Sequence, residues 1–171
     1  MEIAPGVIRF ESDYLHLVMT TLVQTSGIVY RFPELATTRF DARLWLADDY
    51  LFFVSLMLQA GGVVYRREPT FTMGRGLNIS HIEWGDPKGL VDNDNMRTML
   101  IHALAHLKLN GPDRQFAQAR LRKTEREICA LLLYFLRRGQ LRLGCGYMLR
   151  RPIVLREMIP ILTKIAGRRT V

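Results

Sequence analysis

The sequence predicts an α/β front followed by an all-helical, basic back. Short runs of β-branched and aromatic residues alternate with helical segments up to about residue 90. Beyond that point the apolar residues recur with helical spacing. The charge changes too, because residues 1–113 contain 10 Lys/Arg and 13 Asp/Glu, whereas residues 114–171 contain 14 and 3. We therefore expect two parts, residues 1–90 and residues 91–171.

The composition is that of a folded domain. Hydrophobic residues make up 49% of the 171 residues, enough apolar surface to exclude wholesale disorder. The longest charge-free run, residues 50–65, is shorter than the roughly 20 residues that a membrane-spanning helix needs. Cys129 and Cys145 form neither a disulfide framework nor a clustered metal site, and no signal-peptide pattern opens the sequence. A reducing cytoplasm is therefore expected.

Helix and strand signals follow one another through the front. Residues 13–23 are predicted to form a short helix and residues 26–31 a strand. A turn or short helix is expected from Pro33, since proline suits the first helical position. Residues 62–73 are predicted to form strand segments, and the glycine-rich residues 74–89 a loop.

The back is predicted to be helical throughout. Helices are expected at residues 94–109, 113–138 and 141–149, and a fourth begins at Pro152. The long second helix is expected to end at Gly139, because glycine commonly follows a helix C-terminus.

The helix predicted at residues 48–60 carries the clearest chemical signal. It is an apolar run that begins with two adjacent acids, Asp48 and Asp49, and is followed by Gly61. One acid is enough to cap the open N–H groups, and the positive end of the helix dipole keeps both ionised. The pair is either an ordinary cap or a cap with an additional carboxylate that can act as a base or bind a polar substrate.

Several short features occur around this helix in a fixed order. They are Thr25-Ser26, Phe40-Asp41, Asp48-Asp49-Tyr50, Ala60-Gly61, the strand Val63–Arg66 and Ser80. In this order and spacing, residues 20–90 resemble the C-terminal half of family 2 glycosyltransferases, which have the GT-A fold.

The resemblance implies transfer of a sugar from a nucleotide-sugar donor to an acceptor hydroxyl, with inversion. In such enzymes the second acid of the element at the helix start is the catalytic base. That role falls on Asp49, and Asp48 is expected to support it and to cap the helix. Asp48 departs mildly from the family pattern, in which Glu is more usual. The positions carried over for substrate binding are Thr25, Ser26, Tyr50, Arg75, Asn78 and Ser80.

The donor-binding half of such enzymes precedes the matching region, and too few residues precede it here. We therefore expect a fragment, which is a truncated product, a piece completed by another polypeptide, or a relic. A divalent metal, Mn or Mg, is expected in the complete enzyme, whereas this chain alone is expected to bind neither metal nor nucleotide sugar tightly. Asp92 and Asp94 follow the base element instead of preceding it, so we expect them to cap the next helix.

Other polar residues have ordinary interpretations. His102 and His106 have the i, i+4 spacing of a zinc pair but lack an evident third ligand. Arg75 lies between two glycines and is either a phosphate contact or a plain loop residue. The loop lacks the His that many relatives carry a few residues before the Ser, and His81 is a weak substitute.

The basic residues 114–171 surround an apolar stripe, a pattern that suits an anionic membrane surface and equally suits a solvated helical face. Nucleic acid is not expected, because no recognition motif is present and aromatic residues are few. The alternative to a glycosyltransferase is therefore a non-catalytic helical module that binds an anionic membrane surface or a partner protein. The expected location is the cytoplasm, with peripheral attachment to the inner face of the membrane as a variant of it.

Overall fold

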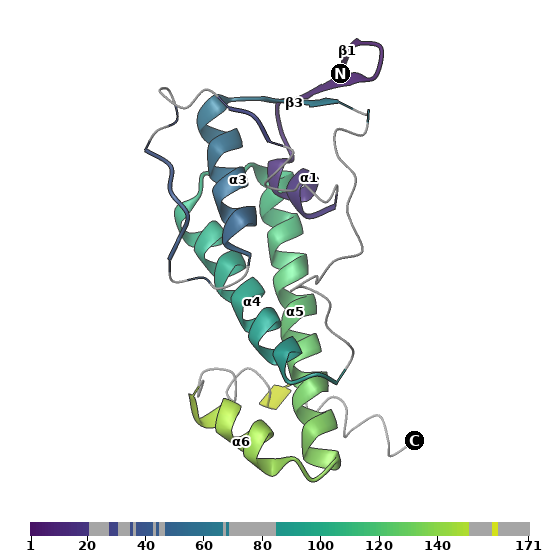
Figure 1. Cartoon of the computed structure of the whole chain (residues 1–171), viewed down its shortest axis with the longest axis vertical. Coiled ribbons are helices and arrows are strands. Elements are labelled where there is room, and N and C mark those ends of the chain that lie inside the picture. Colours follow the sequence, from purple (N-terminus) through teal and green to yellow (C-terminus); the bar gives the residue numbers. More distant parts are fainter. Residues whose placement is uncertain are drawn as a thin grey trace. The chain divides into compact units, whose positions relative to one another are not determined.

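The computed structural model of the chain describes residues 1–20, 28–30, 35, 37–42, 44, 47–66, 68, 85–150 and 159–160. Within these residues it contains five helices and one three-stranded antiparallel sheet (Figure 1). The mixture of helices and strands that the sequence predicts is thereby confirmed. The chain forms two compact units, Met1–Ile79 with Asn95–Leu121, and Ser80–Asp94 with Arg122–Val171.

The sheet belongs to the first unit and has the order β1-β2-β3. Its strands are β1 (Glu2–Ala4), β2 (Val7–Phe10) and β3 (Val63–Arg66). A turn at Gly6, whose φ of 70° suits glycine, joins β1 to β2. β2 then pairs antiparallel with β3, with Ile8 opposite Tyr65. The strand predicted after Gly62 is confirmed at β3, whereas β1 and β2 were not predicted.

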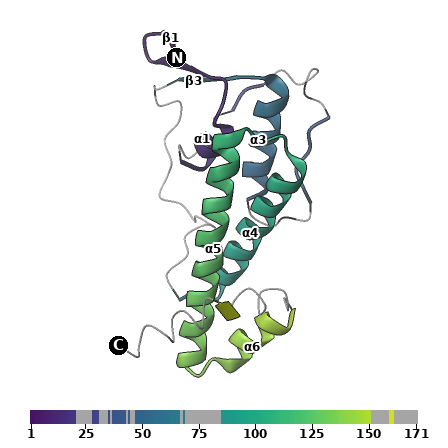
Figure 2. The ribbon, with the colours of Figure 1, turned by 180° about the vertical axis from the view of Figure 1, so that it is seen from behind.

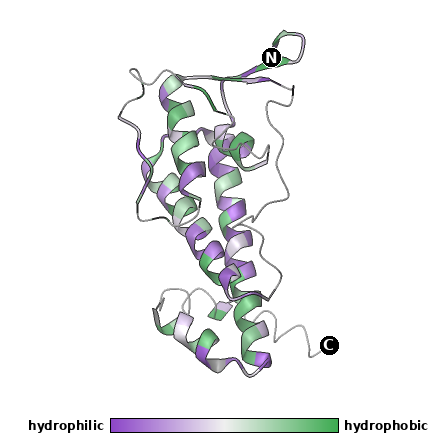
Figure 3. Ribbon diagram, in the orientation of Figure 1, coloured by the Kyte–Doolittle hydropathy of each residue, from purple (hydrophilic) through white to green (hydrophobic). Residues whose placement is uncertain are grey.

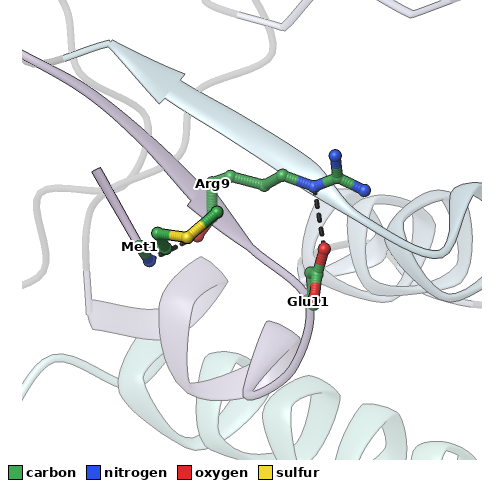
Figure 4. Close-up of polar contacts among 3 residues, drawn as sticks. All are labelled: Met1, Arg9 and Glu11. Carbon is green, nitrogen blue, oxygen red and sulfur yellow. Dashed lines mark hydrogen bonds and ion pairs between the residues drawn. The ribbon is translucent and has the colours of Figure 1, made fainter. Parts of the chain in front are cut away.

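Polar contacts fasten the β1–β2 hairpin (Figure 4). The Met1 amino group donates to the Arg9 carbonyl oxygen at 2.9 Å, and the Arg9 N–H donates to the Met1 carbonyl oxygen at 2.8 Å. The Arg9 Nε lies 3.0 Å from Glu11 Oε1. Both side chains of this ion pair are exposed, so it contributes well under about 1 kcal/mol.

Two helices of the first unit pack directly against each other, α1 (Tyr14–Thr20) and α3 (Asp48–Ala60), as Figures 1 and 2 both show. The helix predicted at residues 48–60 is confirmed at both ends, and Gly61 follows it with a φ of 64°. Beyond its first turn α3 is apolar on most sides, which Figure 3 shows as green. It therefore buries six side chains, namely Leu51, Phe52, Phe53, Val54, Leu56 and Met57.

The strand predicted at residues 26–31 is wrong for the three residues that are described, Ile28, Val29 and Tyr30, which form no strand. Ile28 packs at the edge of the first unit's core, and the Tyr30 ring meets Phe52 edge-on at 6.1 Å between centroids. Ile28 and Tyr30 thus pack against the core of the first unit, whereas Val29 is 99% exposed. A helical Leu35 and a turn at residue 37 agree with the turn or short helix predicted there.

Three helices make up the described part of the back, α4 (Lys88–His106), α5 (Gly111–Arg137) and α6 (Leu141–Arg150). The prediction for α5 is confirmed, including its end at Gly139, whose φ is 72°. The prediction for α6 is confirmed as well. Of the fourth predicted helix, only residues 159–160 are described, and they are helical.

The predicted start of α4 was wrong. The helix begins at Lys88 rather than at residue 94, so Asp92 and Asp94 lie inside it and do not cap it. The cap is Asp86, whose Oδ1 accepts a hydrogen bond from the Lys88 N–H at 2.8 Å. Asp86 followed by a proline is a common helix start, because proline lacks the N–H that the cap would have to satisfy.

Each unit has its own core. In the first unit α1, α3, α4 and α5 contribute to one cluster, which includes Leu15, Phe53, Met99 and Ala117, all nearly inaccessible. In the second unit the cluster consists of Leu90, Ile128, Cys129, Leu131, Leu132 and Phe135. Among the described residues, no helix is both long enough and apolar enough to cross a membrane.

Candidate functional site

The acid pair lies where the chain enters α3 through a left-handed turn. Ala47, the residue at the N-cap position, has a φ of 66° and a ψ of 9° and is itself buried. Alanine has no side-chain oxygen, so it cannot satisfy the open N–H groups of the helix. Any capping from within the first turn must therefore come from Asp48 or Asp49.

No side-chain hydrogen bond caps α3 at Ala47, but the Asp49 carboxylate makes a contact within the first turn. Its Oδ1 accepts a hydrogen bond from the Tyr50 N–H at 2.8 Å. The sequence predicts capping by Asp48, whereas the contact in this turn comes from Asp49. The contact fixes the Asp49 carboxylate on a rigid helix start, because the six buried side chains that follow anchor α3 in the core.

The surroundings of Asp49 raise the pKa of its carboxyl, although the helix dipole was expected to favour the ionised form. Burial raises the pKa of the Asp49 carboxyl, and the charge of Asp48 raises this pKa further. Hydrogen bonds from the backbone N–H groups of Tyr50 and Asp49 lower it, but the net direction is upward. Asp49 is therefore a better proton acceptor than an exposed aspartate, since its conjugate acid is weaker.

Two further ionisable residues, Tyr50 and Arg120, interact electrostatically at this site. Burial raises the pKa of the Tyr50 hydroxyl and the charge of Asp49 adds to this, whereas the charge of Arg120 lowers it. Arg120 comes from α5, within the same compact unit. Its Nε is buried and has no hydrogen-bond partner among the described residues. The site thus brings together a carboxylate, a phenol and a guanidinium group.

Arg120 was missed in the sequence, although a signal for it existed. It comes three residues after Ala117, which is fully buried, and directly before Leu121, which packs against the same core. Helical spacing therefore places Arg120 at the edge of the buried face of α5, where a charged side chain is unusual.

Of the residues predicted to bind substrate, only Tyr50 lies within the described residues. Thr25, Ser26, Arg75, Asn78 and Ser80 lie outside them, as does His81. The predicted Phe-Asp turn is described. The Phe40 ring stacks on Phe52 with 4.1 Å between centroids, and Asp41 Oδ2 lies 4.0 Å from His102 Nδ1.

The described residues do not fit a metal ion. The rings of His102 and His106 lie 4.6 Å apart, and Asp41 approaches one of them. Nevertheless, no group of three His, Cys, Asp or Glu side chains within the described part of the chain could hold a metal. Asp92 lies in α4, where burial raises its carboxyl pKa and the charge of Asp86 adds to this, whereas Lys88 lowers it.

Comparisons of the chain with protein-family models, with curated proteins and with solved structures found no match. The resemblance to family 2 glycosyltransferases therefore depends on the short motifs in the sequence.

Proposed function

We propose that this chain forms the acceptor side of an inverting glycosyltransferase of the family 2, GT-A type, and that Asp49 is its general base. One observation carries the proposal. Asp49 is a partly buried carboxylate on a rigid helix start, and its pKa is raised by burial and by the adjacent Asp48. A general base needs both properties, a fixed position and a pKa moved toward the working pH.

In the proposed reaction, the Asp49 carboxylate accepts the proton of the acceptor hydroxyl. The acceptor oxygen forms a bond to the anomeric carbon of the donor sugar as the bond from that carbon to the nucleoside diphosphate breaks. The diphosphate leaves with the electron pair of that bond, and the proton remains on Asp49 until water removes it. Attack from the side opposite the leaving group inverts the anomeric centre.

The neighbouring residues support this role. Asp48 keeps a second negative charge beside Asp49 and so makes the carboxylate more basic. The hydrogen bond from the Tyr50 N–H holds the carboxylate in one orientation. The Arg120 guanidinium adds a positive charge that acts on the neighbouring Tyr50 hydroxyl, and its buried Nε has no hydrogen-bond partner among the described residues.

The donor and the metal belong to another part of the complete enzyme in this proposal. A nucleotide sugar and a divalent ion, Mn or Mg, would be held by a donor-binding half that comes from a longer chain or from a separate polypeptide. The described residues do not fit a metal, and therefore no step assigned to this chain uses one.

The test compares Asp49→Asn with Asp48→Asn in an enzyme in which this chain is joined to its donor-binding half. Turnover is measured as nucleoside diphosphate released. Asparagine keeps the size and an accepting oxygen but cannot take up a proton, so Asp49→Asn should lower the rate by roughly 10²–10⁴-fold. Asp48→Asn should cost less, because its role is supporting.

Thermal melts of both variants exclude a folding defect. If Asp48→Asn is inactive while Asp49→Asn stays within a few-fold of wild type, the two roles are reversed. If both variants remain active, the carboxylates are structural and the proposed mechanism is wrong. Independently, a carbon NMR titration of this chain should show the Asp49 carboxyl titrating above its ordinary value of 3.8.

A further inference from the structure

The C-terminal part of α5 presents a row of cations opposite the core of the second unit. Arg122, Lys123, Arg126 and Arg137 are all exposed. We call these four residues the basic ridge. At 100° per residue they fall within an arc of roughly 100°, and at 1.5 Å per residue they extend over about 22 Å. The side chains on the other side of the helix are buried, among them Thr124, Ile128 and Phe135.

Few carboxylates accompany the ridge. Residues 122–138 contain five Lys/Arg and two Glu. Glu127 lies at the margin of the ridge, with its Oε1 3.8 Å from the Lys123 Nζ, and Glu125 is partly buried. Arg138, next to the ridge, has its guanidinium over the Tyr134 ring at 5.4 Å. The three ridge arginines thus dominate the charge of this helix face.

The side chains between the cations are apolar. An exposed Ala130 and a partly exposed Leu133 lie between Arg126 and Arg137 on the same arc. The same unit exposes two leucines of α6, Leu143 at 39% and Leu149 at 79%. In Figure 3, hydrophilic residues (purple) and hydrophobic residues (green) alternate along α5 and α6.

This combination fits a lipid surface better than a nucleic acid. Lys and Arg beside exposed small and aliphatic side chains match the lipid headgroups and the boundary of the acyl chains. A single strand of nucleic acid would be bound through open aromatic rings between the cations, whereas the Tyr134 ring beside the ridge is partly buried and lies under the Arg138 guanidinium.

We propose that the basic ridge docks the second unit on an anionic membrane surface. The docking is electrostatic, with the exposed Ala130 and the partly exposed Leu133 between the cations. The proposal is independent of the glycosyltransferase reaction, because its residues lie on other elements than Asp48 and Asp49.

The experiment uses the full chain and two kinds of vesicle, phosphatidylcholine alone and phosphatidylcholine mixed with phosphatidylglycerol. Co-sedimentation should detect binding to the mixed vesicles only, and the binding should weaken as sodium chloride screens the charges. Each surface cation contributes about fivefold to such partitioning, so the triple variant Arg122→Gln, Arg126→Gln, Arg137→Gln should bind about a hundredfold more weakly.

A matched control removes the same charge from the first unit through Arg9→Gln, Lys108→Gln and Arg114→Gln, three other exposed cations. This control variant should bind the mixed vesicles nearly as tightly as the wild type does. A second ridge variant, with the three arginines changed to lysine, should bind like the wild type because the charge is kept. Thermal melts check the fold of each variant.

The proposal is overturned by any of three results. The two glutamine variants could weaken binding equally, which would mean a diffuse effect of net charge. The chain could bind both vesicle compositions equally well. Duplex DNA could bind to the ridge, with loss in the ridge variant, while anionic vesicles do not bind.

Discussion

Asp113 connects the start of α5 to the start of α1 in the first unit. Its replacement tests how much this connection stabilises the fold that carries Asp49. The residue lies in the first turn of α5 and is only 1% exposed. Its Oδ1 accepts hydrogen bonds from the N–H groups of Leu15 at 3.0 Å and His16 at 3.2 Å, and so caps α1. Its Oδ2 is buried and has no hydrogen-bond partner among the described residues.

Asp113→Ala removes both the accepting oxygen and the negative charge, whereas Asp113→Asn removes the charge alone. Comparing the two variants therefore separates the contribution of the hydrogen bonds to stability from that of the charge. Alanine leaves two N–H groups at the start of α1 without their acceptor, which costs about 1–3 kcal/mol for each buried group. Removing a poorly paired buried carboxylate offsets part of that loss. We therefore expect Asp113→Ala to lower the free energy of unfolding by about 2 kcal/mol. Asparagine keeps the accepting oxygen, and Asp113→Asn should equal or exceed the wild type at neutral pH.

The pH dependence has a definite sign. Burial raises the pKa of the Asp113 carboxyl above 3.8, although hydrogen bonds from the His16, Leu15 and Tyr14 N–H groups oppose this and Asp13 adds to it. The folded chain thus binds this proton more tightly than the unfolded chain. The stabilisation from this group is complete below 3.8 and is lost as the pH rises through the folded pKa.

Urea unfolding followed by circular dichroism measures these effects, at several pH values between 3.8 and neutrality. The advantage of Asp113→Asn over the wild type should grow as the pH rises. An Asp113→Ala variant as stable as the wild type, or an Asp113→Asn variant as unstable as Asp113→Ala, would contradict the capping role of Asp113. An advantage of asparagine that grows on acidification would contradict the raised pKa of the Asp113 carboxyl.

Two backbone positions give further predictions, both measured by urea unfolding. Ala47→Gly should stabilise the chain by about 1 kcal/mol, because a φ of 66° strains an alanine and suits a glycine; no gain would mean that Ala47 is not left-handed in solution. Gly85→Ala should destabilise by about 1–3 kcal/mol, since the new Cβ would lie 2.9 Å from the Tyr134 ring and the φ is 92°. Gly146→Ala is the control, because its Cβ would meet nothing within 4 Å and should gain up to about 1 kcal/mol of helix propensity. Equal effects at Gly85 and Gly146 would contradict the packing around Tyr134.

The elements predicted correctly are those whose signals are local. α3 combines acids at its start, an uninterrupted apolar run and a glycine at its end, and each signal agrees with the others. The start of α4 was missed although its signal is also local. The glycines around Asp86 and Pro87 suggested a loop, and this outweighed the capping pattern that the two residues form.

The elements that were missed depend on contacts between distant residues. β2 is four residues long, and its partner β3 lies more than fifty residues further along the chain. Nothing within residues 7–10 indicates that pairing. The same holds for Arg120, which affects Tyr50 only because α5 and α3 share a core, and for Asp113, whose hydrogen bonds reach 98 and 97 residues back.

The charge of Asp49 lowers the stability of the folded chain, and a role in the reaction would explain why the charge is present. A helix start needs an accepting oxygen, and asparagine supplies one as well as aspartate does. Asp49 does supply one, to the Tyr50 N–H, but its charge is also partly desolvated and lies beside that of Asp48. Because its pKa is raised, the charged form costs the folded chain stability at neutral pH. Asp49→Asn should therefore keep the hydrogen bond from the Tyr50 N–H and should not destabilise the chain. A variant that loses turnover without losing stability would mean that the charge serves the reaction, since the hydrogen bond does not require it.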